Sequence, residues 1–218
     1  LKLAFGIAVA LILTSERARG KRFLRSLVIL PMGLPAVFSI TVWSKIFDNA
    51  RYSLANKVLL NLGFEKVSWM TERWLAFLTY NVTEVWLAYP FIVIITVSAL
   101  QDVPDALHDA AKVDGAGYLA RFRHVTLPAI KRPVMFGGIL TAAASFQQFL
   151  IPFIFNDGGP GEANSLLIHY GYTEAFGNTS PAYGKAASIM MLTLLFIGAF
   201  MWLNVKKGKL ADGRSEEH

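Results

Sequence analysis

A charged segment, residues 104–128, lies between two long apolar segments and carries the residues best suited to chemistry. Its charged side chains are Asp105, Asp109, Lys112, Asp114, Arg121 and Arg123, and this density of charge excludes the segment from lipid. The chemistry that these residue types offer is recognition. A carboxylate can pair with a basic group on a partner, and small alanines and glycines let a partner's groove come close.

The spacing of apolar residues predicts a helix–turn–helix in this segment. Residues on one predicted helical face recur at intervals of three and four, with charges on the other side: Ala106, Leu107, Ala110, Ala111 and Val113. Pro104 and Asp105 favour a helix start, and Gly115 favours a turn. A second short helix is predicted from Tyr118 to about Val125, ending before Pro128.

These residues also carry a resemblance. The run Asp109-Ala110-Ala111, then three residues, Gly115, nine residues and Val125-Thr126-Leu127-Pro128 resembles the EAA loop of ABC importer permeases. The spacing matches throughout, with Asp109 in place of Glu and Val125 in place of Ile. Residues 105–128 are therefore called the EAA-like loop. An ordinary amphipathic loop between two membrane helices is the alternative interpretation.

The composition indicates a membrane protein. Of the 218 residues 54% are hydrophobic, which is high for a soluble domain, and there is no cysteine for a disulfide or a Cys-based metal site. We predict an all-α, polytopic transmembrane helical bundle that forms a single domain over 1–218. The predicted spans are about 1–14, 26–47, 74–100, 134–155 and 185–205, with the cytoplasmic loop at 101–133.

The first apolar run, 1–14, is shorter than the roughly 20 residues that a full span needs. The chain opens on Leu1 inside this run, so we expect it to be the end of a truncated helix, with one or more N-terminal helices missing.

Basic residues are distributed unevenly between the predicted loops. Fourteen Lys and Arg fall in 15–25, 101–133 and 206–218, against four in 48–73 and none in 156–184. The positive-inside rule places the EAA-like loop and the C-terminus in the cytoplasm. The net charge of +6 is thus a topology signal, and we expect no nucleic-acid partner.

Further motifs extend the resemblance over nearly the whole chain, and they are similar to those of carbohydrate permeases of the maltose and glycerol-phosphate type. The matching segments are Leu30-Pro31, Leu34-Pro35, Trp43 through Phe47, Val85 through Phe91, Gly158-Gly159-Pro160-Gly161, and Tyr183 through Ala187. The resemblance implies the multi-pass permease of a carbohydrate importer in a bacterial or archaeal inner membrane.

The resemblance also implies partners. The chain has no P-loop, so ATP and Mg²⁺ would be bound by two separate cytoplasmic ATPase subunits, and this chain would be a translocation subunit without enzymatic activity. The residues expected to dock them are Asp105, Asp109, Ala110, Ala111, Asp114, Gly115, Leu127 and Pro128. A second permease, expected to form a heterodimer with this chain, an external solute-binding protein and membrane lipid complete the predicted assembly, which would work by rigid-body alternating access.

By similarity to the maltose-type pattern, six residues are expected to line the substrate pathway: Glu84, Leu87, Ala88, Phe91, Thr141 and Ser145. Phe91 would stack on a sugar ring, and the hydroxyls would bond to the sugar. Each has an alternative: Glu84 near the outer interface, Phe91 in helix packing, and Thr141 and Ser145 bonding between helices. His169 is predicted to lie in a solvated external loop. No metal site is expected.

Three other functions remain as alternatives: an ABC permease for a solute other than sugar, an enzyme within the membrane, and a secondary transporter. The absence of a Ser/His/Asp or metal constellation in the spans argues against the enzyme. The absence of inverted repeats argues against the secondary transporter.

Overall fold

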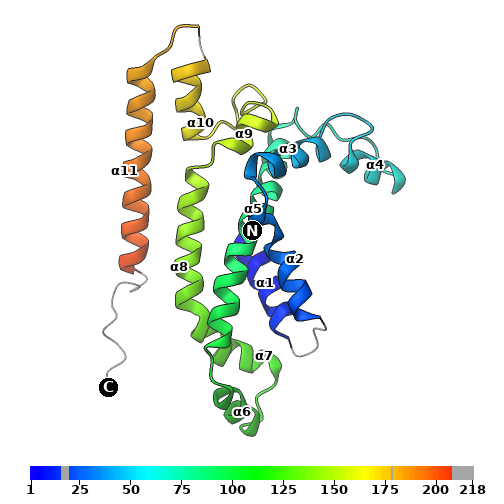
Figure 1. Cartoon of the computed structure of the whole chain (residues 1–218), viewed down its shortest axis with the longest axis vertical. Coiled ribbons are helices and arrows are strands. Elements are labelled where there is room, and N and C mark those ends of the chain that lie inside the picture. Colours follow the sequence, from blue (N-terminus) through cyan, green and yellow to red (C-terminus); the bar gives the residue numbers. More distant parts are fainter. Residues whose placement is uncertain (16–19, 178, 208–218) are drawn as a thin grey trace. The chain divides into compact units, whose positions relative to one another are not determined.

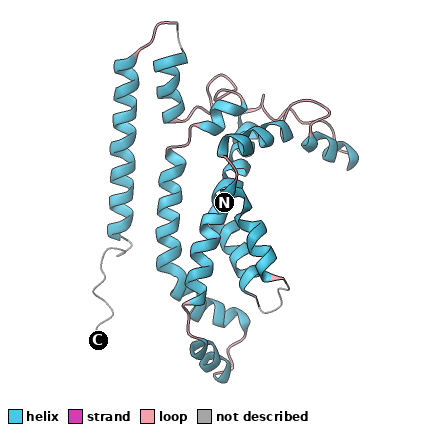
Figure 2. Cartoon of the chain, in the orientation of Figure 1, coloured by secondary structure: helices cyan, strands magenta, loops and turns pink. Residues whose placement is uncertain are grey.

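The computed structural model describes residues 1–15, 20–177 and 179–207, and in this part of the chain all regular structure is helical (Figures 1 and 2). The main α-helices are α1 (Lys2–Thr14), α2 (Lys21–Gly33), α3 (Ala36–Ile46), α4 (Leu54–Asn61), α5 (Arg73–Gln101), α8 (Leu127–Phe146) and α11 (Tyr183–Lys207). Shorter elements are α6 (Asp105–Val113), α7 (Tyr118–Arg121), α9 (Leu150–Phe155), α10 (Leu167–Tyr172) and two π-helical stretches, η1 (Phe122–Thr126) and η2 (Thr173–Gly177). The predicted all-α class is confirmed.

The helices form two compact units. The first unit contains residues 1–29 and 88–142 and the chain from 200 onward, and the second unit contains residues 30–87 and 143–199. The helix α5 contributes its first half to the second unit and its second half to the first. Each unit is described separately below.

In the first unit, α1 and α5 pack closely through a glycine. A Cβ atom built on Gly6 would lie 2.6 Å from Cγ2 of Ile92, so a larger residue would push the helices apart. Next to this glycine in α1, Phe5 meets the Tyr89 ring edge-on, with 5.3 Å between centroids. The ammonium of Lys2 donates to the Thr141 carbonyl of α8 at 2.9 Å. These contacts join α1 to both α5 and α8.

In the second unit, α3, α5 and α9 share an apolar cluster around the buried Ile40, Tyr80 and Ile151. The short helix α4 is fixed through the buried Asn56, whose side chain bonds to the backbone of Ala50 and Val67 and accepts from Nε1 of Trp69. One amide thus satisfies four polar groups of the turn around α4.

Two helices of the described chain, α5 and α11, are long and apolar enough to cross a membrane. The predicted span 26–47 consists of two helices bent by 97°, Phe23–Gly33 and Ala36–Ile46, with Pro31 inside α2 and Pro35 at the N-cap of α3. Because proline lacks an N–H and restricts the preceding residue, the chain bends at this point. The apolar α1 is shorter than a span.

The structure differs from the predicted span at 134–155. The helix α8 begins at Leu127 and ends at Phe146, and α9 follows as a separate element. At the break, the side-chain Oε1 of Gln148 accepts a hydrogen bond from the Phe149 N–H at 3.1 Å, in place of a helical carbonyl. The basic segments predicted at 15–25 and 206–218 lie partly outside the described residues.

Candidate functional site

The EAA-like loop forms a compact helix–turn–helix in the first unit, at the ends of α5 and α8 (Figure 1). Helix α6 begins after Pro104 with Asp105 in its first turn, where a carboxylate interacts favourably with the helix dipole. Gly115 follows α6 with φ +77°, a left-handed conformation that glycine adopts without strain. The predicted first helix and the turn at glycine are both present.

The second half of the loop differs from the prediction. We expected a helix that ends before Pro128, but α7 and η1 continue through helical dihedral angles into α8. Pro128 is the second residue of α8, where its missing N–H costs little because the preceding turn is π-helical. Leu127 and Pro128 therefore lie at the exposed start of α8.

A buried apolar cluster packs against both ends of the EAA-like loop. Ala99 near the end of α5 and Val103 in the turn after it pack with Ile130 of α8, and Val125 of η1 joins them. This cluster fixes both ends of the loop to the helices that it connects. A displacement of the loop therefore acts directly on α5 and α8.

The apolar side chains of α6 and α7 face outward. No residue of α6 or α7 is buried, and Val113 and Leu119 are 88% and 75% exposed. Ala110 is exposed and Ala111 half-buried. Side chains of this kind on an amphipathic helix are normally covered by a partner surface.

Asp109 presents a charged carboxylate on α6. The ammonium of Lys112, one turn away, donates to Oδ1 of Asp109 at 2.8 Å, and this bond holds the pKa of Asp109 below its ordinary value. A carboxylate has about four acceptor positions, so a bond from Lys112 leaves capacity for a basic group of a partner. Asp114 is the exposed C-cap of α6.

The six predicted pathway residues lie on two helices. Glu84, Leu87, Ala88 and Phe91 occupy α5 at intervals that place them on one helical face, and each is half-buried. Glu84 and Leu87 belong to the second unit, and Ala88 and Phe91 belong to the first.

On α8, Thr141 is buried, and its hydroxyl donates to the carbonyls of Gly137 and Gly138 at 3.0 and 3.1 Å. The hydroxyl proton is thus bonded within α8. Ser145 is half-buried and lies four residues further along the same helix, in the second unit. Whether these six residues contact a substrate stays a prediction.

The glycine-rich loop, residues 156–177, contains a polar network that the sequence did not predict. His169 was expected to be solvated, but it is only 2% exposed. Its Nδ1 lies 2.8 Å from Oγ of Ser165, and its Nε2 lies 3.0 Å from Oδ1 of Asp157. The prediction was wrong because two polar neighbours within the loop satisfy both ring nitrogens and permit burial.

Two asparagines fix the same loop to the start of α5. The Asn156 amide donates to the Met70 carbonyl at 3.0 Å, and Tyr80 donates to its Oδ1. The Asn164 amide donates to the carbonyls of Arg73 and Gly159, each at 3.0 Å. Asparagines next to the Gly158-Gly159-Pro160-Gly161 run were the available sequence signal, since such residues often hydrogen-bond to the backbone of turns.

In the part of the chain that the structure describes, no group of three or more His, Cys, Asp or Glu residues is arranged to hold a metal ion. The site therefore consists of an exposed recognition element, the EAA-like loop, and of polar side chains on the apolar helices α5 and α8.

Comparison with known proteins agrees with this arrangement. The family described as binding-protein-dependent transport system inner membrane component matches residues 2–207. The trehalose/maltose transport system permease protein MalF of Thermococcus litoralis is 31% identical over 96% of this chain and 69% of its own length. The maltodextrin permease MdxF of Bacillus subtilis is 31% identical over 99% of this chain and 52% of its own length. For MalF of Escherichia coli the identity is 31%, over 96% of this chain and 42% of the relative.

Solved structures share the fold. A chain of a bacterial ABC transporter involved in the import of the acidic polysaccharide alginate superimposes with a TM-score of 0.81 at 17% identity, covering 95% of this chain and 72% of that one. A chain of the MetNI methionine ABC transporter gives a TM-score of 0.60 at 18% identity, and the match covers 95% of this chain and 84% of that one. The long apolar helices, the EAA-like loop and the match over residues 2–207 lead to one conclusion: this chain belongs to the family of inner membrane components of binding-protein-dependent transport systems.

Proposed function

We propose that this chain is the membrane-spanning permease subunit of an ATP-driven, binding-protein-dependent importer that carries a carbohydrate by alternating access. The family match supports the transport role, and the names of the relatives, which include maltose, maltodextrin and galactooligosaccharide permeases, support a sugar. The fold is shared by alginate and methionine transporters, so the fold alone does not select the solute.

The observation that carries the proposal is the exposed EAA-like loop on its buried base. The apolar residues of α6 and α7 face outward, while Ala99, Val103 and Ile130 fix the ends of the loop to the rest of the first unit. An ATPase subunit would cover α6, with a basic residue beside Asp109. Movement of that ATPase would then be transmitted to α5 and α8 as rigid bodies.

The ATPases are expected as two cytoplasmic subunits that bind ATP and Mg²⁺, because this chain has no P-loop. A second permease would complete the pore, and an external binding protein would deliver the solute. The excess of Lys and Arg around the EAA-like loop supports its cytoplasmic location, and the glycine-rich loop would then lie outside the cell.

For the substrate pathway, the face of α5 that carries Glu84, Leu87, Ala88 and Phe91 offers one carboxylate and one aromatic ring to a solute. Phe91 would stack on an apolar sugar face, and Ser145 or Thr141 would bond to sugar hydroxyls. Glu84 would accept from a hydroxyl, since a carboxylate facing lipid is costly.

The test is uptake by the assembled importer in vesicles, measured with maltose, maltotriose, a polyamine and methionine. We expect uptake of the maltose-type sugars alone, and Phe91→Ala should reduce it about tenfold while the ATPases remain bound. Phe77→Ala, at an exposed phenylalanine of α5, is the matched control and should leave uptake unchanged. Uptake of the polyamine or methionine in place of sugar would contradict the proposal that the solute is a carbohydrate. An equal loss of uptake in the Phe91→Ala and Phe77→Ala variants would contradict the proposed role of Phe91 in the substrate pathway.

A further inference from the structure

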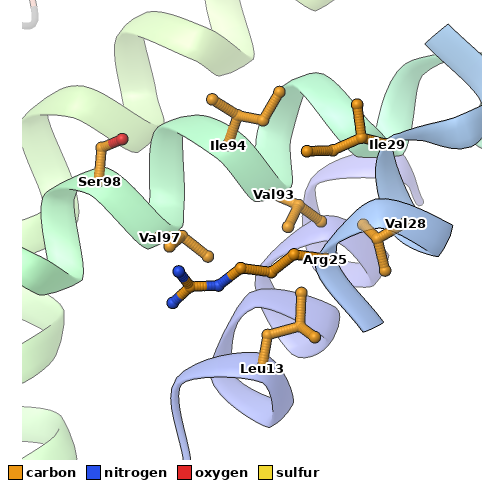
Figure 3. A pocket seen from close by; sticks show the side chains of 8 residues that line it. All are labelled: Leu13, Arg25, Val28, Ile29, Val93, Ile94, Val97 and Ser98. Carbon is orange, nitrogen blue, oxygen red and sulfur yellow. The ribbon is translucent and has the colours of Figure 1, made fainter. Parts of the chain in front are cut away.

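A small pocket in the first unit has a composition that neither sugar transport nor ATPase docking explains. It measures about 120 Å³ and lies between the end of α1, the middle of α2 and the second half of α5. Figure 3 shows its apolar walls: Leu13 comes from α1, Val28 from α2, and Val93 and Val97 from α5.

Arg25 is the only charged side chain among the described residues that line this pocket. In Figure 3 its side chain extends from α2 between Leu13 and Val97. Its Nε is buried and has no hydrogen-bond partner within the described part of the chain. A buried donor of a charged group without a partner is costly, so this position favours a ligand that supplies an acceptor.

The chemistry of the walls restricts that ligand. A guanidinium binds phosphate oxygens well because its N–H groups form a planar fork. A free phosphate would be desolvated against Val28, Val93 and Val97, whereas a phosphate attached to a hydrocarbon chain would match both the cation and the walls. Ile29 and Ile94, which also line the pocket, are exposed, so the pocket opens at an apolar surface of this unit, beside a helix long and apolar enough to cross a membrane.

We propose that this pocket binds an anionic phospholipid, with the phosphate on the Arg25 guanidinium and an acyl chain against Val28, Val93 and Val97. The proposal rests on the membrane location of the chain and not on its transported solute. With the EAA-like loop in the cytoplasm, the basic segment 15–25 places Arg25 at the cytoplasmic leaflet, where anionic lipids attract such segments.

The experiment is native mass spectrometry of the assembled importer in detergent, with phosphatidylglycerol, phosphatidylcholine or inorganic phosphate added. We expect phosphatidylglycerol to bind about tenfold more tightly than phosphatidylcholine, and inorganic phosphate not to displace it. Arg25→Gln should abolish this preference. Val97→Phe, which fills the pocket and keeps the charge, should reduce phosphatidylglycerol binding about tenfold. Arg51→Gln, at an exposed arginine outside the pocket, is the matched control and should leave it unchanged.

A second readout protects the test against misfolding. Phosphatidylglycerol should raise the melting temperature of the wild-type complex more than that of Arg25→Gln or Val97→Phe, because a ligand stabilises only the state that binds it. If Arg25→Gln does not fold, the loss of phosphatidylglycerol binding in Val97→Phe decides whether the proposal stands. Equal binding of the two lipids, displacement by inorganic phosphate, or unchanged binding in both variants would overturn the proposal. Lipid binding to the isolated chain but not to the assembled importer would also overturn it, and would indicate a partner subunit in the pocket.

Discussion

The EAA-like loop and the glycine-rich loop both connect apolar helices, and both are rich in polar residues and glycine. In the glycine-rich loop the polar side chains bond within the chain, as at Asn156, Asn164 and His169. In the EAA-like loop, no residue of α6 or α7 is buried, and Asp109 pairs with Lys112 across one exposed turn. The comparison indicates that the glycine-rich loop stabilises its own unit, whereas the helices of the EAA-like loop expose a surface that the proposed ATPase would cover.

The largest expected effect is on stability in the glycine-rich loop. Asn164, which is 7% exposed, satisfies the Arg73 and Gly159 carbonyls, and Asn164→Ala leaves both without this donor. We expect a loss of about 1–3 kcal/mol for each carbonyl, measured as a fall in melting temperature by tryptophan fluorescence. Asn61→Ala, at an exposed asparagine, is the matched control. Equal melting temperatures for the two variants would contradict the claim that the polar side chains of the glycine-rich loop stabilise their own unit.

A smaller loss of stability is expected at the histidines. His169→Leu removes two hydrogen bonds, worth about 1 kcal/mol each, although Asp157 can be hydrated because its side chain is 74% exposed. His124→Leu in the EAA-like loop changes an exposed ring and should have little effect. The measurement is again the melting temperature, and a larger loss for His124→Leu would reverse the predicted order.

At the turn of the EAA-like loop we expect an effect on docking. Gly115 has φ +77°, and a Cβ atom at this position would meet no other atom within 4 Å, so Gly115→Ala costs only backbone strain, about 1 kcal/mol. This strain should weaken ATPase binding about fivefold in a titration with the purified ATPase. Gly117→Ala, at a glycine with φ −65°, meets no such strain. Equal affinities would show that the turn conformation is not needed for docking.

The smallest effect is expected at Lys112. Lys112→Ala should raise the pKa of Asp109 toward its ordinary value of 3.8, because the bond and charge that lower it are lost. A lowered carboxyl pKa stabilises the folded chain above the ordinary pKa, and this stability disappears as pH falls through the lowered value. Above about pH 6 the melting temperature of Lys112→Ala should therefore fall, but only slightly, since exposed pairs contribute little, and the difference should disappear at low pH. NMR titration of ¹³C-labelled aspartate measures the pKa, and an unchanged midpoint would contradict the pairing.

Local patterns predicted the elements whose stability depends on nearby residues. The apolar length of α5 and α11, the periodicity of α6 and the turn at Gly115 were all evident in the sequence. The bend between α2 and α3 coincides with Pro31 and Pro35, which restrict the backbone locally.

Long-range contacts decided the features that were missed. Asn164 meets the Arg73 carbonyl across 91 residues of sequence, and no local pattern indicates such a pair. The buried His169 was predicted to be solvated for the same reason: its environment is set by how the loop folds back on Asp157. The break after α8 is a local exception: there the Phe149 N–H donates to Oε1 of the adjacent Gln148, a bond that hydrophobic periodicity does not indicate.

The central claim is that the EAA-like loop binds an ATPase subunit, and copurification of the ATPase with the permease tests it most directly. Asp109→Lys reverses the charge on α6, and Glu65→Lys makes the same change at an exposed carboxylate of the second unit. We predict that Asp109→Lys lowers the amount of copurified ATPase at least about tenfold and that Glu65→Lys leaves it unchanged. Full retention of the ATPase by a folded Asp109→Lys variant would contradict the account.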